Sequence, residues 1–162
     1  MTVHETPISP CLWFDSELEE AATFYSSVFP DSSVHLTRMP GPDGGPGAVV
    51  AGEFTLAGLT FRGINGGPQH AGFTETVSFS IACADQAEVD HYWYRLLDGG
   101  EESMCGWLKD RFGLSWQVVP RRLDELLRDP DPARGSAVME AMLRMRRIVV
   151  ADLEAAAEAV SA

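Results

Sequence analysis

The sequence predicts an α+β protein that contains two copies of one strand–helix–strand–strand–strand unit. Two apolar, strand-like segments, residues 8–14 and 76–83, are each followed by a helical pattern of apolar residues. An aromatic pair also lies inside each helix, Phe24-Tyr25 in the first and Trp93-Tyr94 in the second. Repeated units of this kind share a core and place equivalent faces toward each other.

The first unit begins with the strand at 8–14, in which Pro10 has no backbone N–H to donate. Asp15 and Ser16 are N-cap candidates for the helix that follows, and Pro30-Asp31 ends it. Apolar residues recur on one face of this helix: Leu18, Ala21, Ala22, Tyr25, Val28 and Phe29. Three strands, separated by a glycine- and proline-rich loop and by a turn at Ala57-Gly58, complete the unit: residues 33–39, 48–56 and 59–64.

The second unit repeats this order. Its first strand, 76–83, alternates apolar and polar residues, which is typical of a half-buried strand. Asp85 is the N-cap candidate of the next helix, and Gly99-Gly100 ends that helix. Two strands, around 104–109 and 114–120, complete the unit. The last one opens with Gly-Leu-Ser-Trp, which matches Gly-Leu-Thr-Phe at the same place in the first unit.

A helical tail is expected after the second unit, at about 122–160. It contains a short turn near 123–127 and helical patterns at 132–147 and 150–160. We expect a single domain over residues 1–162, in which the first module spans about 6–68 and the second about 73–121.

Composition excludes several classes of protein. The formal net charge is −12, from 24 acidic and 12 basic residues, and this acidic excess opposes nucleic-acid binding. No apolar stretch reaches the roughly 18 residues that a membrane span needs. The three cysteines form no CxxC motif, and the N-terminus lacks the pattern of a secretory signal. We therefore expect a cytoplasmic protein with reduced thiols that binds neither nucleic acid nor membrane.

Several segments together resemble one known family. They are residues 6–15 (TPISPCLWFD), 28–32 (VFPDS), 65–68 (NGGP), 73–75 (FTE) and 105–117 (CGWLKDRFGLSWQ). The chain is similar in these segments to the PhnB-like branch of the vicinal oxygen chelate superfamily, the glyoxalase/bleomycin-resistance-like proteins. This branch often carries the label 3-demethylubiquinone-9 3-methyltransferase domain. The resemblance extends from about residue 6 to residue 156, and its last motif is specific to the branch.

The resemblance implies two βαβββ modules whose mixed sheets curl around a cavity, commonly within a homodimer. In metal-using relatives, four cavity-facing side chains hold a divalent ion. Strand parity and the repeat place these positions at Ser9, Arg62, Ser78 and Gln117. Only Gln117 suits a metal, because arginine stays protonated and serine hydroxyls are poor ligands for zinc or iron. The four histidines have neither HxH nor HExxH spacing. We predict no cofactor, with a divalent metal as the alternative.

Polar candidates for function have two readings each. Arg62, with Ser78 and Gln117, forms a donor-rich floor for a carboxylate or phosphonate, or else extends its guanidinium into water. Cys105 is a nucleophile or a packing residue. Glu75 is a general base or a hydrogen-bonding loop residue.

The apolar candidate residues also have two possible roles each. Cys11 and Trp13 share a strand face with Ser9, and Trp107 and Phe73 add further lining for an apolar ligand pocket. The alternative is that these aromatic residues belong to the core.

The resulting prediction is a small-molecule-binding protein of this fold, without a functional metal centre and with an unidentified ligand. The alternative is a divalent-metal-dependent lyase or dioxygenase of the same superfamily, and a third reading is a scaffold whose acidic surface and C-terminal helices bind a partner. Methyltransferase activity does not fit, because the glycine-rich segment 41–47 leads into a strand rather than a helix and forms no nucleotide cradle.

Overall fold

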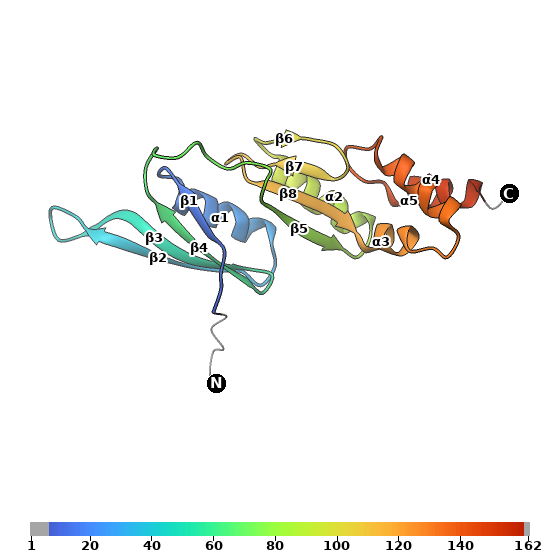
Figure 1. Ribbon diagram of the computed structural model, residues 1–162. Coiled ribbons are helices and arrows are strands. Elements are labelled where there is room, and N and C mark those ends of the chain that lie inside the picture. The colour runs from blue at the N-terminus through green and yellow to red at the C-terminus, as the bar shows by residue number, and fades with distance from the viewer. Residues whose placement is uncertain (1–6, 161–162) are drawn as a thin grey trace. The chain divides into compact units, whose positions relative to one another are not determined.

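The computed structural model describes residues 7–160, which form two compact units divided between Gly72 and Phe73 (Figure 1). Each unit contains a four-stranded mixed sheet and a helix packed on one face of it. The strand orders are equivalent, β1-β4-β3-β2 and β5-β8-β7-β6. The predicted α+β fold with two βαβββ modules and added C-terminal helices is confirmed.

The first unit comprises residues up to Gly72. Its elements are β1 (Cys11–Phe14), α1 (Leu18–Val28), β2 (Ser33–Pro40), β3 (Pro46–Leu56) and β4 (Leu59–Asn65). Strand β1 runs parallel to β4, and the β2–β3 and β3–β4 pairs are antiparallel. The β3–β4 turn has positive φ at both Ala57 (47°) and Gly58 (88°), as the tight hairpin turns that match strand twist require.

The second unit contains the second sheet and the tail. Its elements are β5 (Ser78–Cys83), α2 (Gln86–Leu97), β6 (Glu101–Glu102), β7 (Trp107–Lys109), β8 (Ser115–Pro120), α3 (Arg121–Leu127), α4 (Pro132–Met142) and α5 (Val150–Ala159). Strand β5 runs parallel to β8, and the other pairs are antiparallel. Asp85 caps α2 as predicted, because its carboxylate accepts the Glu88 N–H at 2.9 Å.

Strand alternation separates core from open face in both sheets. In the first unit, Leu12 and Phe14 are buried while Cys11 is exposed. In the second unit, Trp116 and Val118 on β8 are buried, as is Trp93 on α2, the helix that packs on this strand. Side chains one position away therefore lie on the sheet face opposite the helix, as the pattern predicts.

Several predicted strand boundaries move. Strand β5 begins at Ser78 rather than at residue 76, and Val77 is 62% exposed. Strand β3 begins at Pro46 rather than at residue 48. Strand β1 begins at Cys11 rather than at residue 8, and Ile8 is 87% exposed. The residue before it, Pro10, contributes only its carbonyl, which accepts the Arg62 N–H. Strand β7 begins at Trp107 rather than at residue 104, because Cys105 and Gly106 have positive φ values of 60° and 82° that no strand residue adopts.

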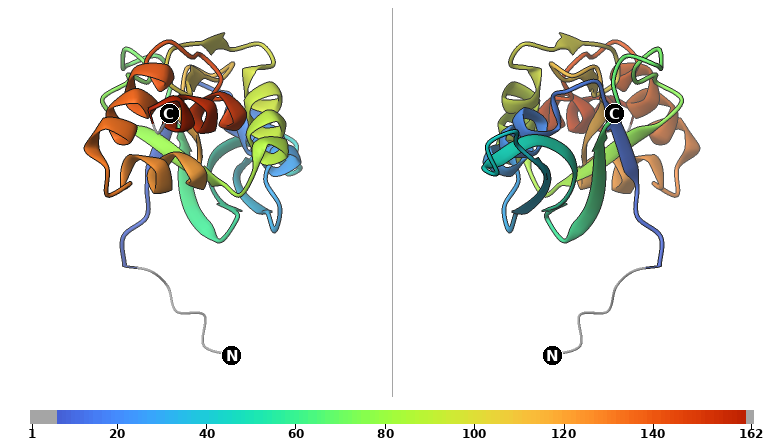
Figure 2. Two further views of the ribbon diagram at one scale, coloured as in Figure 1. Left: turned by 90° about the vertical axis from the view of Figure 1, so that its right-hand side faces the viewer. Right: turned by 90° about the vertical axis from the view of Figure 1, so that its left-hand side faces the viewer.

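The tail differs from the prediction in two places. A helix, α3, replaces the predicted turn at 123–127, and α4 ends at Met142 rather than at residue 147. The three tail helices pack together (Figure 2) around a small buried core. This tail core consists of Leu123, Leu126, Val138, Ile148, Leu153 and Ala157. Burial of Leu123 and Leu126 explains why the short segment is helical.

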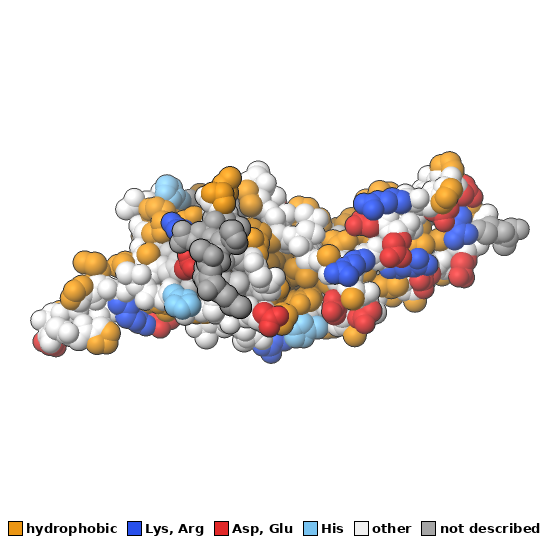
Figure 3. Space-filling model, turned by 90° about the horizontal axis from the view of Figure 1, so that it is seen from below, with side chains coloured by type: hydrophobic (Ala, Val, Ile, Leu, Met, Phe, Trp, Pro, Cys, Tyr) orange, Lys and Arg blue, Asp and Glu red, His pale blue; other side chains and the backbone are white. Residues whose placement is uncertain are grey.

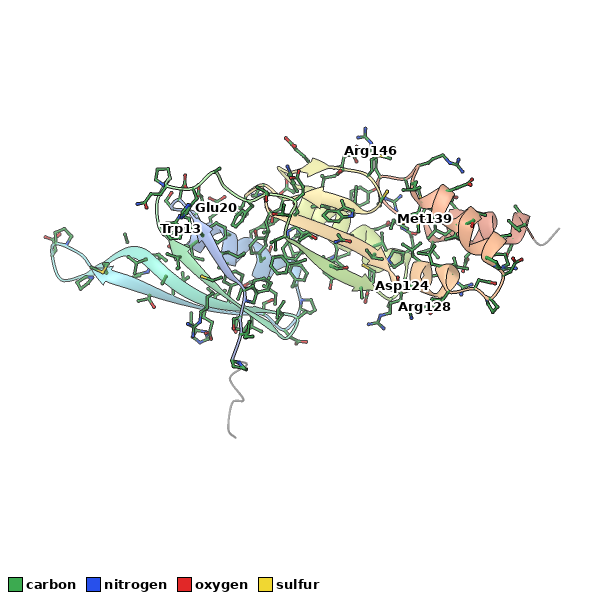
Figure 4. All side chains as sticks on the ribbon, viewed as in Figure 1. Trp13, Glu20, Asp124, Arg128, Met139 and Arg146 are labelled. Atoms are coloured by element: carbon green, nitrogen blue, oxygen red, sulfur yellow. The ribbon has the colours of Figure 1, made fainter. Side chains whose placement is uncertain are left out.

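Basic residues of the tail are distributed among acidic ones (Figure 3, right). Arg146, labelled in Figure 4, pairs with Glu102, and Arg147 pairs with Asp90. Arg122 pairs with Glu154 at 2.8 Å. Each of these three arginines therefore has a carboxylate partner. Within residues 7–160, no helix is both long and apolar enough to cross a membrane.

Candidate functional site

The open face of the first sheet carries a cavity of about 870 Å³. All four strands and the segment before β1 contribute to it. The lining residues are Pro7, Ile8, Ser9, Cys11, His35, Leu36, Thr37, Ala51, Gly52, Glu53, Arg62, Gly63 and Ile64. The cavity thus contains three of the predicted site residues, Ser9, Cys11 and Arg62.

A polar row crosses this face from one edge of the sheet to the other. Cys11 lies opposite Arg62, Arg62 opposite Glu53, and Glu53 opposite His35. Directly opposed residues on one face approach closely enough for their side chains to interact. The row therefore brings a thiol, a guanidinium, a carboxylate and an imidazole to one surface.

Arg62 is the cationic centre of this row. Its side chain is exposed, and it forms no ion pair within residues 7–160. An adjacent row is apolar, with Ile64 opposite Ala51. The site consequently combines a free guanidinium with an apolar border, which is the usual make-up of a pocket for a small organic anion.

Trp13 lies outside the cavity. Its indole N–H donates to the Gly67 carbonyl at 3.0 Å, and its ring meets His70 edge-on at 4.6 Å between centroids. A Cβ on Gly66 would lie 2.0 Å from the Trp13 ring, so glycine is required there. Figure 4 shows Trp13 beside this loop. The residue holds the loop that follows β4, a role that the sequence did not predict.

On the second sheet, Ser78 and Gln117 lie side by side on the open face. The Gln117 amide donates to the Ser78 hydroxyl at 2.9 Å. Gln117 pairs in register with Trp107 on β7, and Ser78 pairs with Ser115. The predicted neighbourhood of Ser78 and Gln117 thus exists within the second unit.

A smaller pocket of about 150 Å³ occupies the edge of this face. It is lined by Glu75, Glu101, Glu102, Ser103, Trp107, Leu108, Lys109 and Ser115. Glu75 forms an ion pair with Lys109. The hydrogen bond between them lowers the pKa of Glu75 and raises the pKa of Lys109. Glu75 is therefore a poorer general base, and Lys109, the sole lysine, is a poorer Schiff-base amine.

The most specific sequence motif has a structural role. The Asp110 carboxylate is buried and accepts three hydrogen bonds. They come from the backbone N–H groups of Phe112 (2.9 Å) and Leu114 (3.1 Å) and from the indole of Trp116 (2.8 Å). One side chain thus closes the β7–β8 turn and fixes the core tryptophan.

Cys105 and Phe73 line neither cavity. The backbone N–H of Cys105 donates to the Met145 carbonyl at 2.7 Å, which attaches the tail to the β7 loop. The backbone of Cys105 is therefore a junction between the β7 loop and the tail.

The residues at the four family metal positions do not fit a metal ion. Arg62 carries a permanent positive charge, and Gln117 and Ser78 are engaged with each other. Across residues 7–160, no three His, Cys, Asp or Glu side chains are grouped so as to hold a metal. We derive no step through a metal.

Cavity residues that were not among the sequence candidates include His35, Glu53, Lys109 and Ser115. Each lies opposite a residue of its own cavity on a neighbouring strand. The available signal was strand parity, but it becomes specific only when the pairing register is known.

Comparison with known proteins identifies relatives for most of the chain. Residues 6–119 match the family described as 3-demethylubiquinone-9 3-methyltransferase. A PhnB protein from Bacillus cereus is 32% identical, with a TM-score of 0.61, over 71% of this chain and 99% of its own. A Pseudomonas aeruginosa protein shares the fold, at 19% identity and a TM-score of 0.57, over 70% of this chain and 96% of its own. No curated protein matches.

Proposed function

Since the chain belongs to the 3-demethylubiquinone-9 3-methyltransferase family, in its PhnB-like branch with the glyoxalase fold, we propose that it binds a small organic anion on the open face of the first sheet. The observation that carries this proposal is Arg62, which is exposed inside the 870 Å³ cavity and has no ion-pair partner in the part of the chain that the structure describes. Cavities of about 300–1,000 Å³ are the usual size of small-molecule sites.

The chemistry of the polar row indicates how such a ligand is held. A planar guanidinium binds a carboxylate or phosphonate through two parallel hydrogen bonds. Ile64 and Ala51 supply apolar contact for the remainder of the ligand. On β3, opposite Arg62, the Glu53 carboxylate would repel an anionic group. The ligand is therefore a monoanion or dianion with an apolar part.

Methyl transfer receives no support from the glycine-rich segment. Residues 41–45 form the turn between the antiparallel strands β2 and β3, where no helix N-terminus cradles a nucleotide phosphate. The metal-dependent lyase or dioxygenase remains the second candidate, favoured only by the fold. Stoichiometric zinc, iron, nickel or manganese in protein purified without a histidine tag would overturn the metal-free proposal and favour this candidate.

The test is a two-dimensional NMR titration of the full chain with a panel of aromatic carboxylates and phosphonates, such as benzoate and phenylphosphonate. We expect saturable shifts at the amides of Cys11, Glu53 and Arg62. Arg62→Gln should weaken binding by about tenfold or more, because a charge-assisted contact is lost. The matched control is Arg38→Gln, whose guanidinium pairs with Glu19 outside the cavity.

Two results contradict the proposal: no saturable shift with any member of the panel, or unchanged affinity in Arg62→Gln.

Light scattering in the same buffer tests the expected homodimer, which has twice the 17.6 kDa mass of the chain.

A further inference from the structure

We propose that the small pocket of the second unit is a separate binding site for an organic cation that carries N–H donors, such as a primary ammonium group. The site lies between β6, β7 and the start of β8, and it is independent of the function proposed for the first sheet.

The first argument is an unsatisfied hydroxyl. Ser115 is 1% exposed and lines this pocket, and its Oγ has no hydrogen-bond partner among residues 7–160. Buried polar groups in folded proteins nearly always have a partner. A ligand N–H directed at this oxygen provides one.

The second argument is the charge around that hydroxyl. In register across the sheet, Ser115 lies opposite Lys109, and Lys109 lies opposite Glu101. The Lys109 ammonium is paired with Glu75, and Glu101 forms no ion pair within residues 7–160, although its charge also acts on Lys109. The pocket therefore has one carboxylate in excess, which favours a cation over an anion.

The third argument is aromatic lining and size. Trp107 borders the pocket, and an indole ring attracts cations more strongly than other aromatic rings. A volume of about 150 Å³ equals that of about five water molecules in the liquid. The space suits a small alkylammonium group, or the end of a longer amine.

The test uses ethylammonium chloride as the probe in an NMR titration of the full chain at constant ionic strength. We expect saturable shifts of the Lys109 and Ser115 amides and of the Trp107 indole N–H. The indole resonance of Trp107 is identified as the one that is missing from the spectrum of Trp107→Phe. Sodium acetate, similar in size and opposite in charge, should give no saturable shift. Ser115→Ala and Glu101→Gln should each weaken ethylammonium binding by about fivefold or more.

Ser80→Ala is the matched control, since Ser80 lies on the same open face but outside the pocket. The Ser80→Ala variant should bind ethylammonium with the same affinity as the wild type. Glu101 is exposed, so Glu101→Gln tests the site even where Ser115→Ala perturbs folding. Saturation by acetate alone, no saturation by either probe, or wild-type affinity in the Glu101→Gln variant would overturn the proposal. If neither probe saturates, only water occupies the pocket, and if Glu101→Gln binds as the wild type does, ethylammonium binds without this carboxylate.

Discussion

The three cysteines occupy three different environments, although all are free thiols. Cys11 is exposed on the open face of the first sheet, Cys105 is partly exposed in the β7 loop, and Cys83 is buried at the end of β5. Burial, followed by the nearby carboxylates of Glu88 and Asp85, raises the pKa of Cys83 to about 12. Reactivity therefore depends on position rather than on residue type.

We predict that the Cys83 thiol makes stability fall at alkaline pH. In the unfolded chain this thiol has a pKa near 9.0, and in the folded chain near 12. Below pH 9 both states hold the proton, and above it the unfolded state loses the proton first. The free energy of unfolding should therefore decline as pH rises from 9 toward 12. Urea unfolding at pH 7, 9 and 10.5 measures the decline.

Cys83→Ala provides the comparison for this effect. The free energy of unfolding of this variant, lower than that of the wild type at neutral pH, should approach the wild-type value as pH rises, because the alanine variant has no thiol to titrate.

Thiol labelling with a disulfide reagent at pH 8 should modify Cys11 in the folded protein and Cys83 only after unfolding. Equal labelling rates for Cys11 and Cys83 would show that burial does not protect the thiol.

At the scale of single elements, helix α1 obtains its N-terminal cap from a distant strand. The sequence favours Asp15 or Ser16 as the cap, but the helix begins at Leu18 and its N-cap residue, Glu17, makes no side-chain cap. Instead, the Asn65 side chain accepts the Leu18 N–H at 3.0 Å and donates to the Val49 carbonyl at 3.1 Å. One amide thus joins the helix start to two strands.

We expect Asn65→Ala to lower the free energy of unfolding by about 1–2 kcal/mol, the usual effect of losing an N-cap, with a further contribution from the unpaired Val49 carbonyl. Ser16→Ala is the control and should change stability by less than about 0.5 kcal/mol, because Ser16 does not cap the helix. Chemical denaturation of both variants checks the prediction. If Ser16→Ala lowers the free energy of unfolding more than Asn65→Ala does, Ser16 rather than Asn65 caps the helix.

For the whole molecule, the tail is the main addition to the family fold. The family match ends at residue 119, and the Bacillus cereus protein is covered almost completely by 71% of this chain. The tail is nevertheless integrated into the second unit. The Gln86 side chain donates to the Ile148 carbonyl at 3.1 Å and accepts the Val150 N–H at 2.7 Å. The Gly106 N–H also donates to the backbone carbonyl of Arg146.

Ile148 is the residue through which this attachment is best tested. It is fully buried in the tail core and contacts the Gly106 position closely. We expect Ile148→Ala to lower the free energy of unfolding by about 2–4 kcal/mol, as other large-to-small core changes do. Leu143→Ala, at a residue 55% exposed, should change it by less than about 0.5 kcal/mol.

Denaturation followed by fluorescence should show this difference between the two variants. If Ile148→Ala leaves the stability unchanged, the tail unfolds separately from the second unit. Retention of the Arg62 cavity in both variants is expected, since that cavity lies wholly in the first unit.

Much of the fold was predictable because its signals are local. Strand parity predicted that Cys11 lies on the open face, where it is exposed, and Asp85 was identified as a cap within its own segment. The two-residue strand β6 was missed, because Glu101-Glu102 has no apolar pattern and pairs only through β7.

The sequence by itself determined the repeated unit, the order of its main strands and helices, and the open face of β1, because helical and strand periodicities arise from neighbouring residues. Only the tertiary structure decided that Arg62 lies between Cys11 and Glu53, that Glu75 meets Lys109, and that Asn65 caps a helix. These contacts join residues far apart in sequence, and their geometry depends on strand register and packing, to which local patterns contribute little.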